Sequence, residues 1–178
     1  MNLPNKLTIL RMVMILPFLL VLYLDVTHAA YWALGIFILA SLTDMADGKI
    51  ARKYNLITDF GKFMDPLADK MLVTAAMVWF VEQGRMAGWM LLIVLVREFG
   101  VSGLRMVASD KGRVIAAGWS GKVKTAATMV CLCLMLLSSY SLREFAWLDT
   151  VCVWVITLTT LYSGAEYFIK NRDVLSDM

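Results

Sequence analysis

The chain alternates between long apolar stretches and short polar connections. Residues 1–11 lead into the first long stretch, and Pro4 suits the first turn of a helix, so they predict a short interfacial helix that runs into the membrane. Each following stretch approaches the roughly 20 residues that a helix needs to cross a bilayer. The pattern predicts an all-α integral membrane protein with six transmembrane helices preceded by a short interfacial N-terminal helix. The predicted spans are Leu10–Leu24, Tyr31–Ala51, Phe60–Val81, Ala87–Ala108, Ala116–Ser138 and Trp147–Phe168.

Composition excludes the main alternatives to a membrane protein. Hydrophobic residues make up 60% of the 178 residues and charged residues 17%, against roughly 45–50% and about 25% in soluble domains. Aromatic content of 11% with three prolines argues against disorder, and three cysteines in apolar runs argue against a disulfide scaffold. Six crossings use about 120 residues, and the remainder is enough only for short connections and tails. We therefore expect a single membrane domain over residues 1–178.

Basic residues gather in alternate connections between the predicted spans. The N-terminal segment carries Lys6 and Arg11, and the second and fourth connections are rich in Lys and Arg. The first connection has none, and the third and fifth hold only Arg85 and Arg143. Because basic connections stay on the cytoplasmic side, both termini are predicted to be cytoplasmic, which requires an even number of spans.

Four aspartates lie inside the predicted spans, where a charge costs several kcal/mol and usually has a function or a partner. Asp44 and Asp47 are near the cytoplasmic end of the second span, and Asp65 and Asp69 begin the third. Residues three or four apart share a helix face, and the two spans form a hairpin. The four carboxylates are therefore predicted to converge at one depth.

Converging carboxylates repel one another unless cations lie between them. Ligation by oxygen alone favours Mg²⁺, Mn²⁺ or Ca²⁺ over zinc, and four carboxylates suffice for two ions about 3.5–4 Å apart, an arrangement that clamps a phosphoryl group. We therefore expect two divalent cations, Mg²⁺ or Mn²⁺. The alternative is ion pairing inside the bundle with basic neighbours, namely Lys49, Arg52, Lys62 and Lys70.

The spacing of these residues carries a more specific signal. It reads Asp44-x-x-Asp47-Gly48-x-x-Ala51-Arg52, eight residues, then Gly61-x-x-x-Asp65-x-x-x-Asp69. This pattern resembles the signature of the CDP-alcohol phosphotransferase family. The resemblance implies that the four aspartates bind two metal ions and that Asp69 is also the general base. It further implies contacts to the CDP group from Gly48, Arg52, Thr58, Asn5 and Thr8.

A second group of basic residues lies in the later half of the chain. Arg97 and Arg105 are eight residues apart on the fourth span, and Lys122 and Lys124 begin the fifth. Such a cluster suits a phosphate dianion, so we predict that it binds a phosphorylated acceptor. The alternative for the lysines is contact with lipid headgroups. Arg97 and its neighbour Glu98 either shape the pocket or pair with each other.

Three segments in this half resemble the phosphatidylglycerophosphate synthase branch of the same family: Arg97-Glu98-Phe99, Gly103-Leu104-Arg105 and Gly121-Lys-Val-Lys-Thr125. The resemblance implies transfer of a phosphatidyl group from CDP-diacylglycerol to sn-glycerol 3-phosphate, giving phosphatidylglycerophosphate and CMP. It also implies a homodimer in the bacterial cytoplasmic membrane with the active site facing the cytoplasm, and no nucleic-acid partner.

Two alternatives remain from the sequence. The same chemistry could use another acceptor, such as inositol phosphate. A small cation transporter would use the aspartates as a permeation path, but it would need acidic residues through the whole membrane depth. The outer halves of the predicted spans are nearly free of them.

Overall fold

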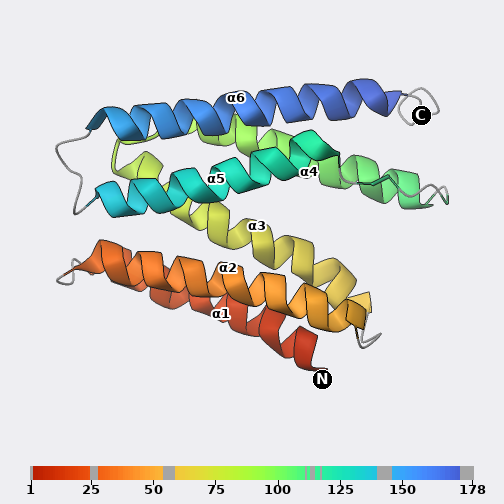
Figure 1. Ribbon diagram of the computed structural model, residues 1–178, viewed down its shortest axis with the longest axis horizontal. Helices are drawn as coiled ribbons and strands as arrows, with labels where there is room; N and C mark the ends of the chain where they lie inside the picture. The colour runs from red at the N-terminus through yellow and green to blue at the C-terminus, as the bar shows by residue number, and fades with distance from the viewer. Residues whose placement is uncertain are drawn as a thin grey trace. The chain divides into compact units, whose positions relative to one another are not determined.

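The computed structural model describes residues 2–24, 28–53, 59–110, 112, 115–116, 118–139 and 146–172, apart from the side chains of residues 3–4, 44–53, 59–63, 65–66, 69, 110 and 146. Within the described ranges the chain is all-helical, as predicted, and contains no strand (Figure 1). The helices are α1 (Leu3–Tyr23), α2 (Ala29–Lys53), α3 (Asp59–Glu82), α4 (Gly88–Asp110), α5 (Trp119–Ser138) and α6 (Ala146–Lys170).

Helices α2 to α6 begin and end within three residues of the predicted spans, but α1 begins much earlier. In the structure, the part of the predicted interfacial segment from Leu3 to Arg11 forms the first turns of α1 and is continuous with the rest of that helix. Pro4 lies in the first turn, where its missing N–H costs no hydrogen bond, and good helix formers follow it. The helix also continues through Pro17, as helices in membranes can.

The described helices have the surface of a membrane protein. Three are long and apolar enough to cross a bilayer, over Asn5–Tyr23, Trp119–Ser138 and Trp147–Lys170. Large apolar side chains point outward along them and along α4, as at Leu16, Val96 and Ile169, which are 63%, 63% and 70% exposed. An outward apolar surface this extensive is not tolerated in water, so the protein is embedded in a membrane.

Two compact units make up the chain, and the first holds Met1–Trp79 and Met135–Ala146. In this unit α1 and α2 form an antiparallel hairpin (Figure 1). The rings of Phe18 and Phe37 pack between them with centroids 6.1 Å apart. Ala33 and Ala40 are fully buried, and such small side chains let two membrane helices approach closely.

The second unit holds Phe80–Leu134 and Trp147–Met178, with α4, α5 and α6 side by side (Figure 1). Near the ends of α4 and α6, Tyr167 is buried among Val101, Leu104 and Ala108. At the start of α6, Asp149 forms an ion pair with Arg85 in the α3–α4 connection. The Nη2 of Arg85 lies 2.6 Å from Oδ2 of Asp149. The second unit is therefore tied together by apolar packing and by ionic contacts between helices.

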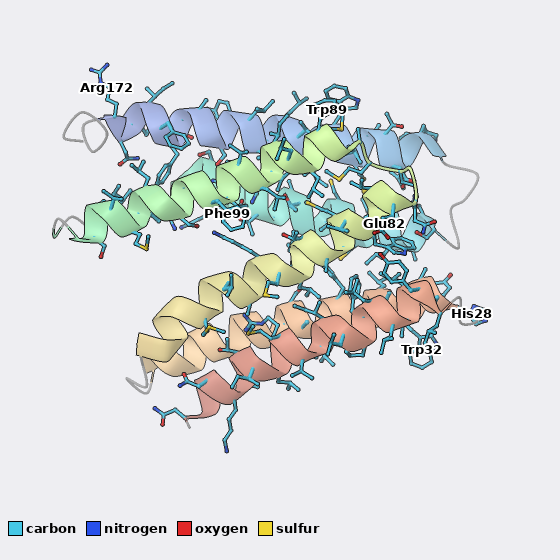
Figure 2. The ribbon with its side chains drawn as sticks, turned by 180° about the vertical axis from the view of Figure 1, so that it is seen from behind. His28, Trp32, Glu82, Trp89, Phe99 and Arg172 are labelled. Atoms are coloured by element: carbon cyan, nitrogen blue, oxygen red, sulfur yellow. The ribbon has the colours of Figure 1, made fainter. Side chains whose placement is uncertain are left out.

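Three tryptophans lie near the starts of helices and point outward. Trp32 is near the start of α2 beside His28, and Trp89 is the second residue of α4 (Figure 2). Trp147 is the second residue of α6. These three side chains are 63%, 53% and 60% exposed, and exposed tryptophans at helix ends are typical of the membrane–water boundary.

Candidate active site

The buried face of α1 changes from apolar to polar along the helix. Its later turns bury Ile15, Phe18 and Leu22. The same stripe continues toward the N-terminus through polar side chains, and Asn5, Thr8 and Arg11 are 8%, 0% and 1% exposed. Three polar side chains buried in successive turns are costly in a membrane protein and usually mark a functional region.

The buried stripe of α2 leads to the first pair of aspartates. Ala30, Ala33, Phe37 and Ala40 are all buried, at spacings of three and four residues. Continuing that spacing along the helix reaches positions 44 and 47, which are in register with these buried residues. Because α1 and α2 are antiparallel, this end of α2 lies beside the polar end of α1 (Figure 1).

Helix α3 repeats this arrangement from its own start. Asp47 is six residues before the end of α2, and Asp65 is six residues after the start of α3. At 1.5 Å per residue each is about 9 Å inside its helix, and Asp44 and Asp69 are about 14–15 Å inside. Six residue steps join the two helix ends, a reach of about 20 Å at most. The two pairs therefore occupy matching positions on consecutive helices of one unit.

The roles of these residues stay predictions. The side chains of Asp44, Asp47, Asp65, Asp69, Gly48 and Arg52, and the whole of Thr58, lie outside the described residues. The backbone shows that each aspartate pair lies on a helix, with the two members of a pair about one turn apart. A donor set of four carboxylates on two helices fits hard divalent cations and excludes thiolate or imidazole ligation at these positions.

A buried ionic cluster lies in the second unit, on three helices. Glu98 of α4 accepts hydrogen bonds from Lys124 of α5 and from Arg97, the latter at 3.0 Å. Arg97 in turn donates from Nη2 to the hydroxyl of Ser163 on α6 at 2.6 Å. The side chains of Arg97, Glu98 and Lys124 are 12%, 18% and 8% exposed, so two cations share one carboxylate in a largely buried site.

A glycine on α6 makes space for the Arg97 side chain. A Cβ at Gly164 would lie 3.1 Å from Cγ of Arg97, so the arginine would have to shift. A Cβ at Gly121 on α5 would lie 3.5 Å from Nη2, which is an ordinary van der Waals contact. Gly164 therefore allows the arginine stem to pack closely against α6.

The structure brings together only part of the predicted phosphate cluster. Arg97 and Lys124 meet through Glu98, whereas Lys122 is exposed, since residues two apart on a helix point to nearly opposite sides. Arg105 lies two turns further along α4, is exposed, and donates from Nε to the hydroxyl of Tyr167 at 3.1 Å.

Sequence reasoning missed the contribution of α6 to this cluster. Ser163 and Tyr167 contact Arg97 and Arg105, respectively. Their spacing of four residues inside an apolar span was an available signal, because it places two hydroxyl groups on one helix face. It does not reveal which helix that face contacts.

Comparison with known proteins bears on all these residues. The model of the CDP-alcohol phosphatidyltransferase family matches residues 1–162, which include both aspartate pairs and most of the ionic cluster. This chain belongs to that family. It is therefore a transferase, and the resemblance of the aspartate motif to the family signature is confirmed.

Similar proteins extend over nearly the whole chain. A CDP-diacylglycerol–glycerol-3-phosphate 3-phosphatidyltransferase of Bacillus subtilis (strain 168) is 40% identical over 190 residues, covering 98% of this chain and 97% of the relative. A protein of the same name from Rickettsia felis is 37% identical, covering 94% and 93%. A probable phosphatidylglycerophosphate synthase of Mycobacterium tuberculosis (strain CDC 1551 / Oshkosh) is 38% identical, covering 97% and 83%.

Proposed function

We propose that this protein transfers the phosphatidyl group of CDP-diacylglycerol to sn-glycerol 3-phosphate, forming phosphatidylglycerophosphate and releasing CMP. The observation that carries the proposal is identity of 37–40% over nearly the full length to relatives named for this reaction. The buried basic residues of α4 and α5 support a phosphorylated acceptor, because a dianion suits a site with more cations than carboxylates.

Asp44, Asp47, Asp65 and Asp69 are the residues that would hold two divalent cations, Mg²⁺ or Mn²⁺. Bound there, the cations would neutralise the pyrophosphate and the charge that develops on departing CMP. Asp69 takes the proton from the attacking hydroxyl of the acceptor, a role that requires hydrogen-bond reach of that hydroxyl. The acceptor oxygen then forms its bond to the phosphorus that carries the lipid, and the bond from that phosphorus to the CMP oxygen breaks.

The nucleotide end of the donor binds to residues of α1, α2 and the connection after it. In this proposal Gly48 lets the nucleotide approach the backbone, Arg52 offers a planar fork to phosphate, and Thr58 contacts the CDP group. Asn5 and Thr8 cover the nucleotide from α1. Their burial at the polar end of the α1–α2 hairpin supports this role, since that end lies beside the aspartate-bearing end of α2.

The acceptor phosphate binds to basic residues of α4 and α5. Arg105 is the main ligand, because its Nε is used by Tyr167 while its two terminal nitrogens have no bond within the described part of the chain. Lys124 and Arg97 add positive charge from the buried cluster, and Lys122 adds it from the exposed side of α5.

The placement of the protein in the membrane is part of the proposal. We infer six crossings of the bacterial cytoplasmic membrane, cytoplasmic termini and an active site that opens to the cytoplasm, where it meets glycerol 3-phosphate and the nucleotide headgroup of CDP-diacylglycerol. The alternation of basic and neutral connections supports this orientation. The first turns of α1 lie at the membrane surface, and two copies of the chain form a homodimer.

The direct test is release of CMP from CDP-diacylglycerol by the purified protein with a panel of alcohols. We expect release with glycerol 3-phosphate and almost none with glycerol, serine or inositol phosphate. A metal chelator should stop the reaction, and Mg²⁺ or Mn²⁺ should restore it. Preference for inositol phosphate would overturn the acceptor, and Mg²⁺ uptake into vesicles without CMP release would indicate the transporter.

Replacement of Arg105 tests the acceptor site. Arg105→Ala should raise the KM for glycerol 3-phosphate at least about tenfold, since charge-assisted hydrogen bonds to phosphate are lost. The KM for CDP-diacylglycerol should stay within about twofold. Lys122→Ala should have a smaller effect in the same direction because its side chain is exposed. Steady-state kinetics with each substrate varied in turn measure both constants, and equal increases in the two would contradict the assignment.

A further inference from the structure

Tyr167, on the buried side of α6, contacts the exposed side chain of Arg105 on α4. The Nε of Arg105 donates to the hydroxyl of Tyr167 at 3.1 Å, and its guanidinium carbon lies 5.5 Å from the centre of the Tyr167 ring. The hydrogen bond holds the Nε end of the guanidinium, and the cation–π contact holds the charged group over the ring. Together they restrict the positions that the group can take.

Tyr167 is itself held in place by its surroundings. It is 7% exposed and packs with Val101, Leu104 and Ala108. Its ring also meets that of Phe168 edge to face, with centroids 6.5 Å apart. A ring enclosed in this way has little rotamer freedom, so the arginine rests on a rigid group.

The contact with Tyr167 uses the Nε of Arg105 and leaves the two terminal nitrogens without a bond within the described part of the chain. Bidentate recognition of phosphate uses two parallel N–H bonds from a guanidinium edge. With Nε bonded to Tyr167, the edge formed by Nη1 and Nη2 remains for a ligand. Arg97 differs, because its terminal nitrogens bond to Glu98 and Ser163.

We propose that Tyr167 is a positioning residue for the acceptor: it orients Arg105 so that the terminal nitrogens bind the phosphate group of glycerol 3-phosphate. This inference rests on the proposed function. Tyr167 acts through Arg105. Pre-orientation raises affinity, because an exposed arginine would otherwise lose considerable rotamer entropy on binding.

The test compares two substitutions that separate the hydroxyl from the ring. Tyr167→Phe keeps the ring and should raise the KM for glycerol 3-phosphate about fivefold, and Tyr167→Leu removes both contacts and should raise it at least about tenfold. The inhibition constant of inorganic phosphate against glycerol 3-phosphate should rise in parallel. Tyr162→Phe is the matched control, since Tyr162 lies on the same helix with 69% exposure, and it should change neither constant.

A double-mutant cycle distinguishes positioning from a structural effect. In the Arg105→Ala background, Tyr167→Phe should change the KM for glycerol 3-phosphate by less than about 1.5-fold, because its effect passes through the missing arginine. The proposal is wrong if Tyr167→Phe leaves this KM unchanged, raises both substrate KM values alike, or acts equally in the Arg105→Ala background. Failure of the unmodified protein to use glycerol 3-phosphate would overturn the proposed function instead.

Discussion

Asp69→Asn should lower kcat by about 10³-fold or more, the largest effect we expect from any single substitution. The amide cannot accept the proton of the acceptor hydroxyl, and it is a poorer metal ligand than a carboxylate. Binding of CDP-diacylglycerol should remain at least partly intact, because the other three aspartates and the residues for the nucleotide are unchanged. Single-turnover CMP release and equilibrium binding of the donor measure the two effects separately.

Asp149→Asn is the matched control for this substitution. Asp149 makes an ion pair with Arg85 at the start of α6 and has no part in the proposed chemistry. Its replacement should leave kcat within about threefold of the original value, since Asp149 supplies neither a proposed metal ligand nor the proposed general base. Comparable rates for Asp69→Asn and the unmodified enzyme would remove Asp69 from the role of general base.

Glu98→Ala should cause the largest loss of stability. It leaves Arg97 and Lys124 largely buried without their shared carboxylate, and removal of one partner from a buried ion pair costs about 3–5 kcal/mol. At roughly 2–4 °C per kcal/mol, the thermal midpoint in detergent should fall by about 10 °C. A thermal unfolding scan of the purified variant measures this shift.

Glu166→Ala is the matched control for the loss of stability expected in Glu98→Ala. Glu166 also pairs with a lysine, Lys170, four residues later on α6, but the side chains of this pair are 24% and 68% exposed. Exposed pairs of this spacing contribute about 0.3–0.5 kcal/mol, so the midpoint should fall by no more than about 2 °C. Equal shifts for the two variants would show that the Glu98 cluster is not a buried network.

Much of this fold could be predicted because membrane helices are specified by simple physical limits. Apolar length alone placed the ends of α2 to α6 within three residues. The first span was predicted to begin at Leu10, whereas helix α1 begins at Leu3. Hydropathy marks where a segment becomes apolar, but a helix can continue through polar residues such as Asn5 and Lys6.

The candidate site was predictable to the extent that it depends on spacing along one helix. The aspartate motif has fixed intervals on two consecutive helices, so its pattern led to the family. The second cluster depends on contacts between helices. Sequence showed that Lys124 is basic, but not that it would be buried against Glu98 while Lys122 faces outward, because that depends on the rotation of α5 against its neighbours.

The central claim is that the aspartates of α2 and α3 hold a pair of divalent ions for phosphatidyl transfer. Electron paramagnetic resonance of the metal-stripped protein, titrated with Mn²⁺ in the presence of CDP-diacylglycerol, tests it directly. We predict two Mn²⁺ per chain with the spectrum of a coupled pair, loss of that coupling in Asp47→Asn, and no change in Asp149→Asn. A single isolated Mn²⁺, or a coupled pair that survives Asp47→Asn, would contradict the account.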